Sequence, residues 1–178
     1  LTRDLLLIAP EIIVSVVLLI ILLFDLIYDK DKRILPYLGL IGLFIALYYS
    51  IGNLGVESHA FLLSSTNGKY GLLSIDSFGS YFKIIILITS ILIIFFAKTS
   101  DEIQKIYSRS GEFYTLVFGM ILGMLFMVSA SDLIMIYLSV ELLSLSSYVL
   151  AGFTKLRERD SEASLKYIIY GAVSSGLM

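Results

Sequence analysis

The chain has 178 residues, of which 58% are hydrophobic and only 16% carry a charge, and its formal net charge is −2. A soluble domain is about 45–50% apolar and about 25% charged, so this composition excludes a disordered chain, a nucleic-acid binder and an ordinary soluble enzyme. With no cysteine and a single histidine, His59, the chain lacks the ligands for disulfides, thiolate chemistry and zinc or haem sites.

Apolar runs dominate the chain, and a membrane-spanning helix needs about 20 mostly apolar residues. We therefore expect an all-α, polytopic bundle of about six transmembrane helices, forming one integral-membrane domain over residues 1–178. The expected spans are residues 5–28, 34–54, 78–97, 113–130, 133–153 and 163–178. Because Pro10 suits the first turn of a helix, the first span can shorten to residues 10–28. The sixth run stops without a closing charge or turn, which predicts a chain truncated at its C-terminus.

The connections between these runs differ in charge. Residues 55–75 form a polar stretch with glycine and serine, and residues 99–110 predict either a short interfacial helix or a solvated loop. Nine basic residues follow the first, third and fifth runs, against two or three on the other side. Since lysine and arginine concentrate in cytoplasmic loops, we expect a multi-pass protein whose N-terminus faces away from the cytoplasm.

Glu141 is the ionisable residue placed deepest in a predicted span. It lies nine residues after Asp132, about 13–14 Å along a helix and therefore near the bilayer midplane. Tyr137, Ser144 and Tyr148 share an arc of about 60° with it at 100° per residue, and this polar stripe must face protein or water. Intramembrane charges are costly and usually functional, which favours a proton or ion relay. The alternative is a buried glutamate that joins helices by hydrogen bonds.

Lys166 lies early in the sixth run and four residues after Glu162, so the two side chains can pair along one helix face. One interpretation is a surface pair with a lysine that reaches toward water. The other is an intramembrane charge that couples to Glu141.

Other polar or small residues in the spans have simpler interpretations. Glu11 follows a proline, and an acid in a first turn is stabilised by the positive end of the helix. Lys83 lies just inside the third run and is expected to extend its ammonium to the interface, and Asp25 is expected to be interfacial. Gly119 and Gly123 form a GxxxG spacing that predicts close helix packing rather than chemistry.

Three runs resemble a known family. Residues 132–153, DLIMIYLSVELLSLSSYVLAGF, resemble the fifth helix of the subunit N family of bacterial respiratory complex I, an NADH-quinone oxidoreductase. This family is related to mitochondrial NADH dehydrogenase subunit 2. Residues 161–175, SEASLKYIIYGAVSS, resemble its sixth-helix signature, and residues 9–12 resemble the start of its first helix. The wider family includes cation/proton antiporter subunits, which share the helix-five glutamate.

The resemblance implies a fold of about 14 helices with two inverted five-helix units and a proton channel in the membrane arm of complex I. In the family, the helix-five glutamate works with a lysine on a broken seventh helix. Glu141 matches that glutamate, Lys166 matches the helix-six lysine, and the broken-helix lysine lies beyond Met178. Secondary candidates for the relay are Tyr137, Ser144, Tyr148 and Glu162.

The same resemblance implies a subunit of a respiratory-chain translocase in the bacterial inner membrane, which moves protons while the complex reduces quinone. Its partners would be the lipid bilayer and other membrane-arm subunits, with no nucleic acid. The chain contains no flavin, nucleotide or cluster motif and no metal site, so NADH, FMN, iron–sulfur clusters and quinone are expected elsewhere in the complex. The alternatives are a subunit of a multi-subunit cation/proton antiporter and a non-transporting membrane scaffold.

Overall fold

The computed structural model describes residues 2–27, 32–65, 68–100, 110–153 and 158–177. Within them, five helices are long and apolar enough to cross a membrane, which confirms the expected all-α membrane bundle. They are α2 (Ala9–Ile27), α3 (Leu35–Gly52) with the preceding 3₁₀ turn η1 (Lys32–Ile34), α4 (Ser77–Thr99), α6 (Ser110–Ser129) and α7 (Leu133–Ala151).

Local sequence signals explain where several helices begin and end. Pro10 and Pro36 occupy the first turns of α2 and α3, where a missing backbone N–H is tolerated. The Asp76 carboxylate caps α4 by accepting a 2.8 Å hydrogen bond from the backbone N–H of Gly79. Asn53 ends α3 and donates its backbone N–H to the carbonyl of Tyr49. The first spanning helix, α2, therefore starts at Ala9, one residue before the proline at which the shortened span was expected to begin.

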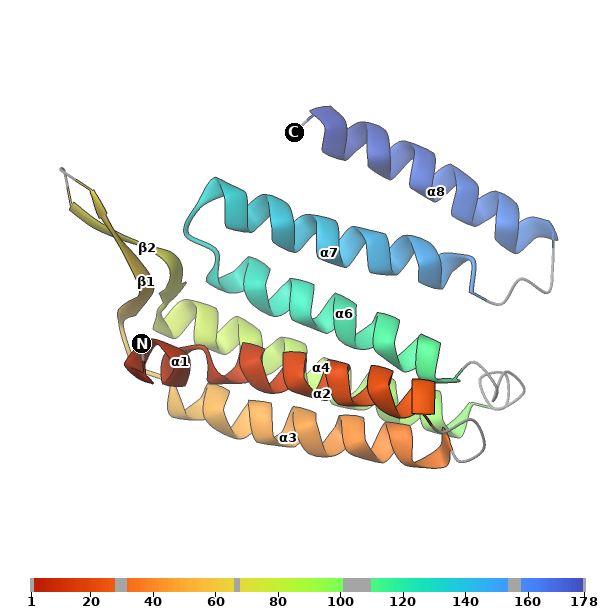
Figure 1. Ribbon diagram of the computed structural model, residues 1–178, viewed down its shortest axis with the longest axis horizontal. Helices are drawn as coiled ribbons and strands as arrows, with labels where there is room; N and C mark the ends of the chain where they lie inside the picture. The colour runs from red at the N-terminus through yellow and green to blue at the C-terminus, as the bar shows by residue number, and fades with distance from the viewer. Residues whose placement is uncertain (1, 28–31, 66–67, 101–109, 154–157, 178) are drawn as a thin grey trace.

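Consecutive spanning helices run in alternating directions (Figure 1). Helices α2, α3, α4 and α6 pack around a shared core, α7 packs on α6, and α8 (Glu158–Leu177) lies on the far side of α7. The core is filled by fully buried side chains from all four central helices, including Val14, Leu43, Leu87 and Phe118. The starts of α2 and α4 and the end of α6 consequently meet at one end of the bundle.

A β-hairpin covers that end of the bundle, where the sequence predicts only a polar connection. Strand β1 (Ser58–Ser65) pairs with β2 (Gly68–Ile75) in antiparallel register, with Ala60 opposite Leu73. Ala60, Leu73 and Ile75 are buried together with Leu7 and Ile8, which lie at the end of α1 (Thr2–Leu7) and immediately after it. In β2, buried side chains alternate with partly exposed ones, the period of a half-buried strand.

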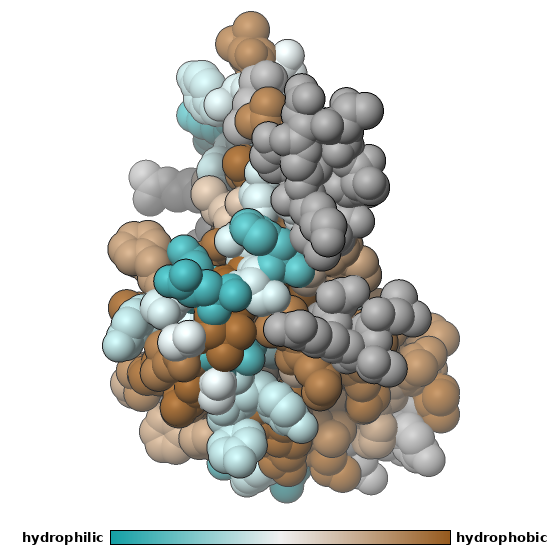
Figure 2. Space-filling model, turned by 90° about the vertical axis from the view of Figure 1, so that its left-hand side faces the viewer, coloured by the Kyte–Doolittle hydropathy of each residue, from teal (hydrophilic) through white to brown (hydrophobic). Residues whose placement is uncertain are grey.

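The surface of the hairpin end is polar, in contrast to the sides of the bundle. Figure 2 looks onto this end, and hydrophilic residues gather near its middle while hydrophobic surface flanks them. Exposed polar residues here include Glu57, His59, Asp76 and Ser131. A polar end and apolar flanks are the distribution expected of helices that cross a bilayer.

Helices α6 and α7 pack closely through the two glycines of the GxxxG spacing. A Cβ atom at Gly123 would lie 2.9 Å from the backbone nitrogen of Leu143, and one at Gly119 would lie 2.8 Å from Ser146 Oγ. The absence of side chains lets the two backbones approach, so the predicted packing role is confirmed.

A helix, α8, forms where the sixth span was expected, although most of its described side chains are exposed. It is not among the five described helices that qualify as spans by length and composition, because its first half is charged. Its crossing of the membrane stays a prediction. Residues 101–109 lie outside the described residues, and so does the choice there between an interfacial helix and a loop.

Candidate functional site

Glu141 is the ninth of the 19 residues of α7, so the structure places it at the middle of a helix able to cross a membrane. Its side chain is half-buried. Within the described part of the chain, Glu141 forms no ion pair. A carboxylate at this position lies at the depth of the membrane interior and at the surface of these helices. A partner outside them can therefore reach it.

The polar stripe of α7 lies on the face opposite to α6. Ser139 and Ser146 are buried where α7 packs against the glycines of α6, and the stripe lies about 180° away at 100° per residue. At one end of the stripe, Tyr148 is 7% exposed and its ring lies 4.8 Å from the ring of Tyr167 on α8. The face that carries Glu141 therefore turns toward the side on which α8 lies.

The hydroxyl of Ser144 does not serve the Glu141 carboxylate. Ser144 Oγ donates to the backbone carbonyl of Val140 at 2.6 Å, and it lies 3.3 Å from the carbonyl oxygen of Glu141. Tyr137, the other member of the stripe, is 43% exposed. Of the secondary candidates, the structure thus joins Tyr148 to α8, and among the described residues neither Tyr137 nor Ser144 forms a hydrogen bond with the carboxylate.

Lys166 and Glu162 form the ion pair that their spacing predicts. Lys166 Nζ lies 2.6 Å from Glu162 Oε1, one turn apart on α8. Both side chains are exposed, by 64% and 62%. Among the described residues, Lys166 and Glu141 are joined by no ion pair and no hydrogen bond. A pair this exposed contributes little to stability, about 0.3–0.5 kcal/mol.

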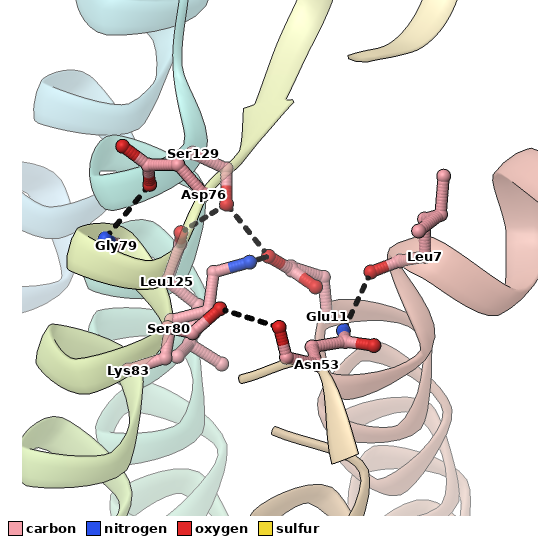
Figure 3. Close-up of polar contacts among 9 residues, drawn as sticks. All are labelled: Leu7, Glu11, Asn53, Asp76, Gly79, Ser80, Lys83, Leu125 and Ser129. Atoms are coloured by element: carbon pink, nitrogen blue, oxygen red, sulfur yellow. Dashed lines mark hydrogen bonds and ion pairs between the residues drawn. The ribbon is translucent and has the colours of Figure 1, made fainter. Parts of the chain in front are cut away.

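A second charged site, which the sequence pattern does not predict, lies inside the bundle. Glu11 Oε1 lies 2.6 Å from Lys83 Nζ and accepts a 2.9 Å hydrogen bond from Ser129 Oγ (Figure 3). Glu11 is 0% and Lys83 2% exposed. Glu11 does lie in the first turn of α2, as expected. The expectation that Lys83 extends to the interface is wrong, because its ammonium points into the bundle toward Glu11.

The alternating directions of successive spanning helices could have pointed to this pair. Glu11 lies near the start of α2 and Lys83 near the start of α4, and these two helices enter from the same end because α3 runs between them in the opposite direction. Which helix faces they occupy depends on the packing of three helices, and hydropathy alone carries no such information.

The end of the bundle around this pair is closed by side chains and by the hairpin. Asn53 Nδ2 donates to the carbonyl of Leu7 at 3.0 Å, and Ser80 Oγ lies 3.5 Å from the carbonyl of Asn53 (Figure 3). Ser131, two residues after Ser129, donates its backbone N–H to Leu72 of β2 at 3.1 Å. The hairpin is therefore fastened beside the Glu11–Lys83 pair.

The opposite end of the bundle has its own ion pair. Asp25 Oδ1 lies 2.6 Å from Lys32 Nζ, and the Asp25 side chain is 19% exposed, which fits its expected place at the interface. An open cavity of about 400 Å³ adjoins Asp25 between α2, α6 and α7. The carboxylates that line this cavity are those of Asp25 and Glu112. Among the described residues, no group of three or more His, Cys, Asp or Glu side chains could hold a metal ion.

Comparison with known proteins identifies relatives along nearly the whole chain. The family model described as "NADH:quinone oxidoreductase/Mrp antiporter, TM" matches residues 130–178. The chain is 39% identical over 171 residues to NADH-quinone oxidoreductase subunit N 2 of Chloroherpeton thalassium, covering 95% of this chain. It is 37% identical over 170 residues to NADH-quinone oxidoreductase subunit N of Chlorobium chlorochromatii, again covering 95% of this chain.

A relative with a different name matches at similar identity. The chain is 37% identical over 169 residues to NAD(P)H-quinone oxidoreductase subunit 2 of Gloeobacter violaceus, covering 94% of this chain and 31% of the relative. For the relatives of Chloroherpeton and Chlorobium, the covered share of the relative is 32%. The chain thus spans about a third of the length of the curated relatives it matches.

Proposed function

Because the chain belongs to the subunit N family of NADH-quinone oxidoreductases, we propose that it is part of an antiporter-like membrane-arm subunit that moves protons across the membrane as its complex reduces quinone. The names of the relatives favour the oxidoreductase over a cation/proton antiporter, since all three of those compared are quinone oxidoreductase subunits.

The observation that carries the proposal is the position of Glu141. Its carboxylate lies at the middle of a spanning helix, in the stripe opposite to α6, where a structural glutamate would be costly. The family match begins at residue 130, so it includes all of α7. A half-buried carboxylate in this position can take up a proton from one side of the membrane and release it to the other.

In the proposed mechanism, Glu141 works through the charge of a neighbouring lysine, the one that the family resemblance places on a broken seventh helix. When Glu141 is ionised, its negative charge holds that lysine protonated, and weakening the pair lowers the lysine's affinity for its proton. The proton then leaves across the membrane. Moving one charge against 100 mV requires about 2.3 kcal/mol, an amount that electrostatic switching of a single close ion pair can supply.

Lys166 is a second proposed relay residue. Its ion pair with Glu162 lies in the first half of α8, a helix that packs beside α7. Glu162 and Lys166 would exchange a proton at that end, while Tyr148, in contact with Tyr167, would hold α7 and α8 together. Tyr137 and Ser144 complete the proposed stripe as hydroxyl groups that could order water near Glu141.

The redox cofactors and the quinone site are proposed to belong to other subunits. NADH, FMN, iron–sulfur clusters and quinone would be held elsewhere in complex I, and the partners of this chain would be neighbouring membrane-arm subunits and lipid. We place it in the bacterial inner membrane with the hairpin end away from the cytoplasm. The positions of Lys32, Arg33 and Lys98 at the opposite end support this orientation.

The test compares Glu141→Gln with Glu57→Gln in the assembled complex in inverted membrane vesicles. Glu57 is an exposed acid outside the spanning helices, so it controls for the loss of one carboxylate. We expect Glu141→Gln to lower NADH-driven acidification of the vesicles while the complex still assembles, and Glu57→Gln to have no effect. Normal acidification with Glu141→Gln would instead support the membrane scaffold.

A further inference from the structure

We propose that Glu11, Lys83 and Ser129 form a second proton-binding site, at the hairpin end of the bundle, through which a proton passes between the membrane interior and the aqueous side. The inference rests on the proposed function, because it assumes that this subunit moves protons. It adds a site on α2, α4 and α6, helices separate from the α7 and α8 residues discussed above.

The two oxygens of the Glu11 carboxylate differ in their contacts. Oε1 receives both the ammonium of Lys83, at 2.6 Å, and the hydroxyl of Ser129, at 2.9 Å. Oε2 is also buried, yet it accepts no hydrogen bond from any described residue. Buried carboxylate oxygens are normally satisfied, so Oε2 is the atom of this cluster at which a proton can bind. Binding there leaves both contacts of Oε1 in place.

The structural explanations for the two charges are insufficient. An acid in a first turn is stabilised by the helix end alone and needs no buried ammonium. A lysine near a helix end ordinarily extends to water, but Lys83 is 2% exposed. A buried ion pair is also poor evidence of stabilisation, because apolar side chains of similar volume are often as stable. The retained charges therefore point to chemistry.

Polar groups lead from the pair toward the hairpin end. Ser80 lies one turn before Lys83 on α4 and contacts the carbonyl of Asn53, which is partly exposed (Figure 3). The nearby charged group is Asp76, which is exposed and caps α4 through Gly79. These groups provide the donors and acceptors that a proton needs between Lys83 and the solvent at this end.

In each cycle, one proton enters the site and one proton leaves it. An arriving proton binds Glu11 Oε2 and converts the carboxylate to the carboxylic acid. Lys83, which has lost its counter-charge, releases a proton toward the hairpin side and becomes a neutral amine. The acid then passes its proton to the amine, which restores the ion pair and completes the cycle.

The test uses two double variants in the full complex, Glu11→Gln with Lys83→Gln and Glu11→Leu with Lys83→Met. Both remove the charges together, so neither leaves a lone buried charge. We expect each to assemble and to lower the number of protons moved per NADH oxidised by about twofold or more. Ser129→Ala, which removes one hydrogen bond but no charge, should have a smaller effect.

Two results would overturn the inference. One is a double variant that moves protons at the wild-type ratio. The other is failure of both double variants to assemble, since it would show that the pair is required for folding. Glu141→Gln is measured in parallel: if that variant loses pumping while a double variant keeps it, only the second site is refuted, whereas normal pumping in both refutes the proposed function.

Discussion

Glu11 Oε1 and Lys83 Nζ lie 2.6 Å apart although α2 and α4 are separated in sequence by α3 and the whole hairpin. The pair lies where three helices meet, and Ser129 of α6 donates a hydrogen bond to its carboxylate. Its formation requires the helices to be assembled, so these charges report on the packed bundle rather than on any one helix.

The single variant Lys83→Met should destabilise the subunit strongly. It leaves the Glu11 carboxylate buried without its counter-charge, and breaking a buried pair in this way costs about 3–5 kcal/mol. Thermal unfolding of the detergent-solubilised complex measures the effect. The apolar double variant with Glu11→Leu should recover most of the loss. If the single and double variants melt at the same temperature, the two charges do not act as a pair.

Lys166→Met should leave stability nearly unchanged. Its partner Glu162 is exposed and one turn away, and such pairs contribute about 0.3–0.5 kcal/mol. Any fall in proton pumping therefore reports on transport rather than on folding. The relevant measurements are the melting temperature and vesicle acidification of the same preparation, with Glu162→Gln alongside. A large drop in melting temperature would show that Lys166 has a structural role.

Gly123→Ala should weaken the contact between α6 and α7. The added methyl group would meet the backbone of Leu143, which cannot rotate away, and such overpacking costs about 1–3 kcal/mol. At Gly119 the nearest atom is the movable Ser146 Oγ, so alanine there should have a smaller effect.

Gly52→Ala is the matched control for these packing variants. Nothing lies within 4 Å of a Cβ atom at Gly52, so this variant should keep the melting temperature of the parent complex. The packing interpretation is wrong if Gly123→Ala and Gly52→Ala behave alike.

The sequence predicts the spanning helices well because their boundaries depend on local signals. Apolar length, Pro10 and the charges that flank each run set the ends of the helices within a few residues. The same local logic finds Glu141, since depth in a span is a count of residues along one helix.

Features that depend on several elements could not be predicted in this way. Serine and glycine give the strands of the hairpin the composition of a loop, and the buried cluster of Ala60, Leu73 and Ile75 with Leu7 forms only in the folded protein. The sequence predicts an interfacial position for Lys83, because the direction of its ammonium depends on the packing of α4 against α2.

The central claim is that the carboxylate of Glu141 carries protons. Its most direct test is the number of protons moved per NADH oxidised by the purified complex in sealed proteoliposomes, for wild type, Glu141→Asp and Glu141→Gln. The account predicts a ratio that falls clearly for Glu141→Gln, which cannot ionise, and only partly for Glu141→Asp. A wild-type ratio for Glu141→Gln would contradict it.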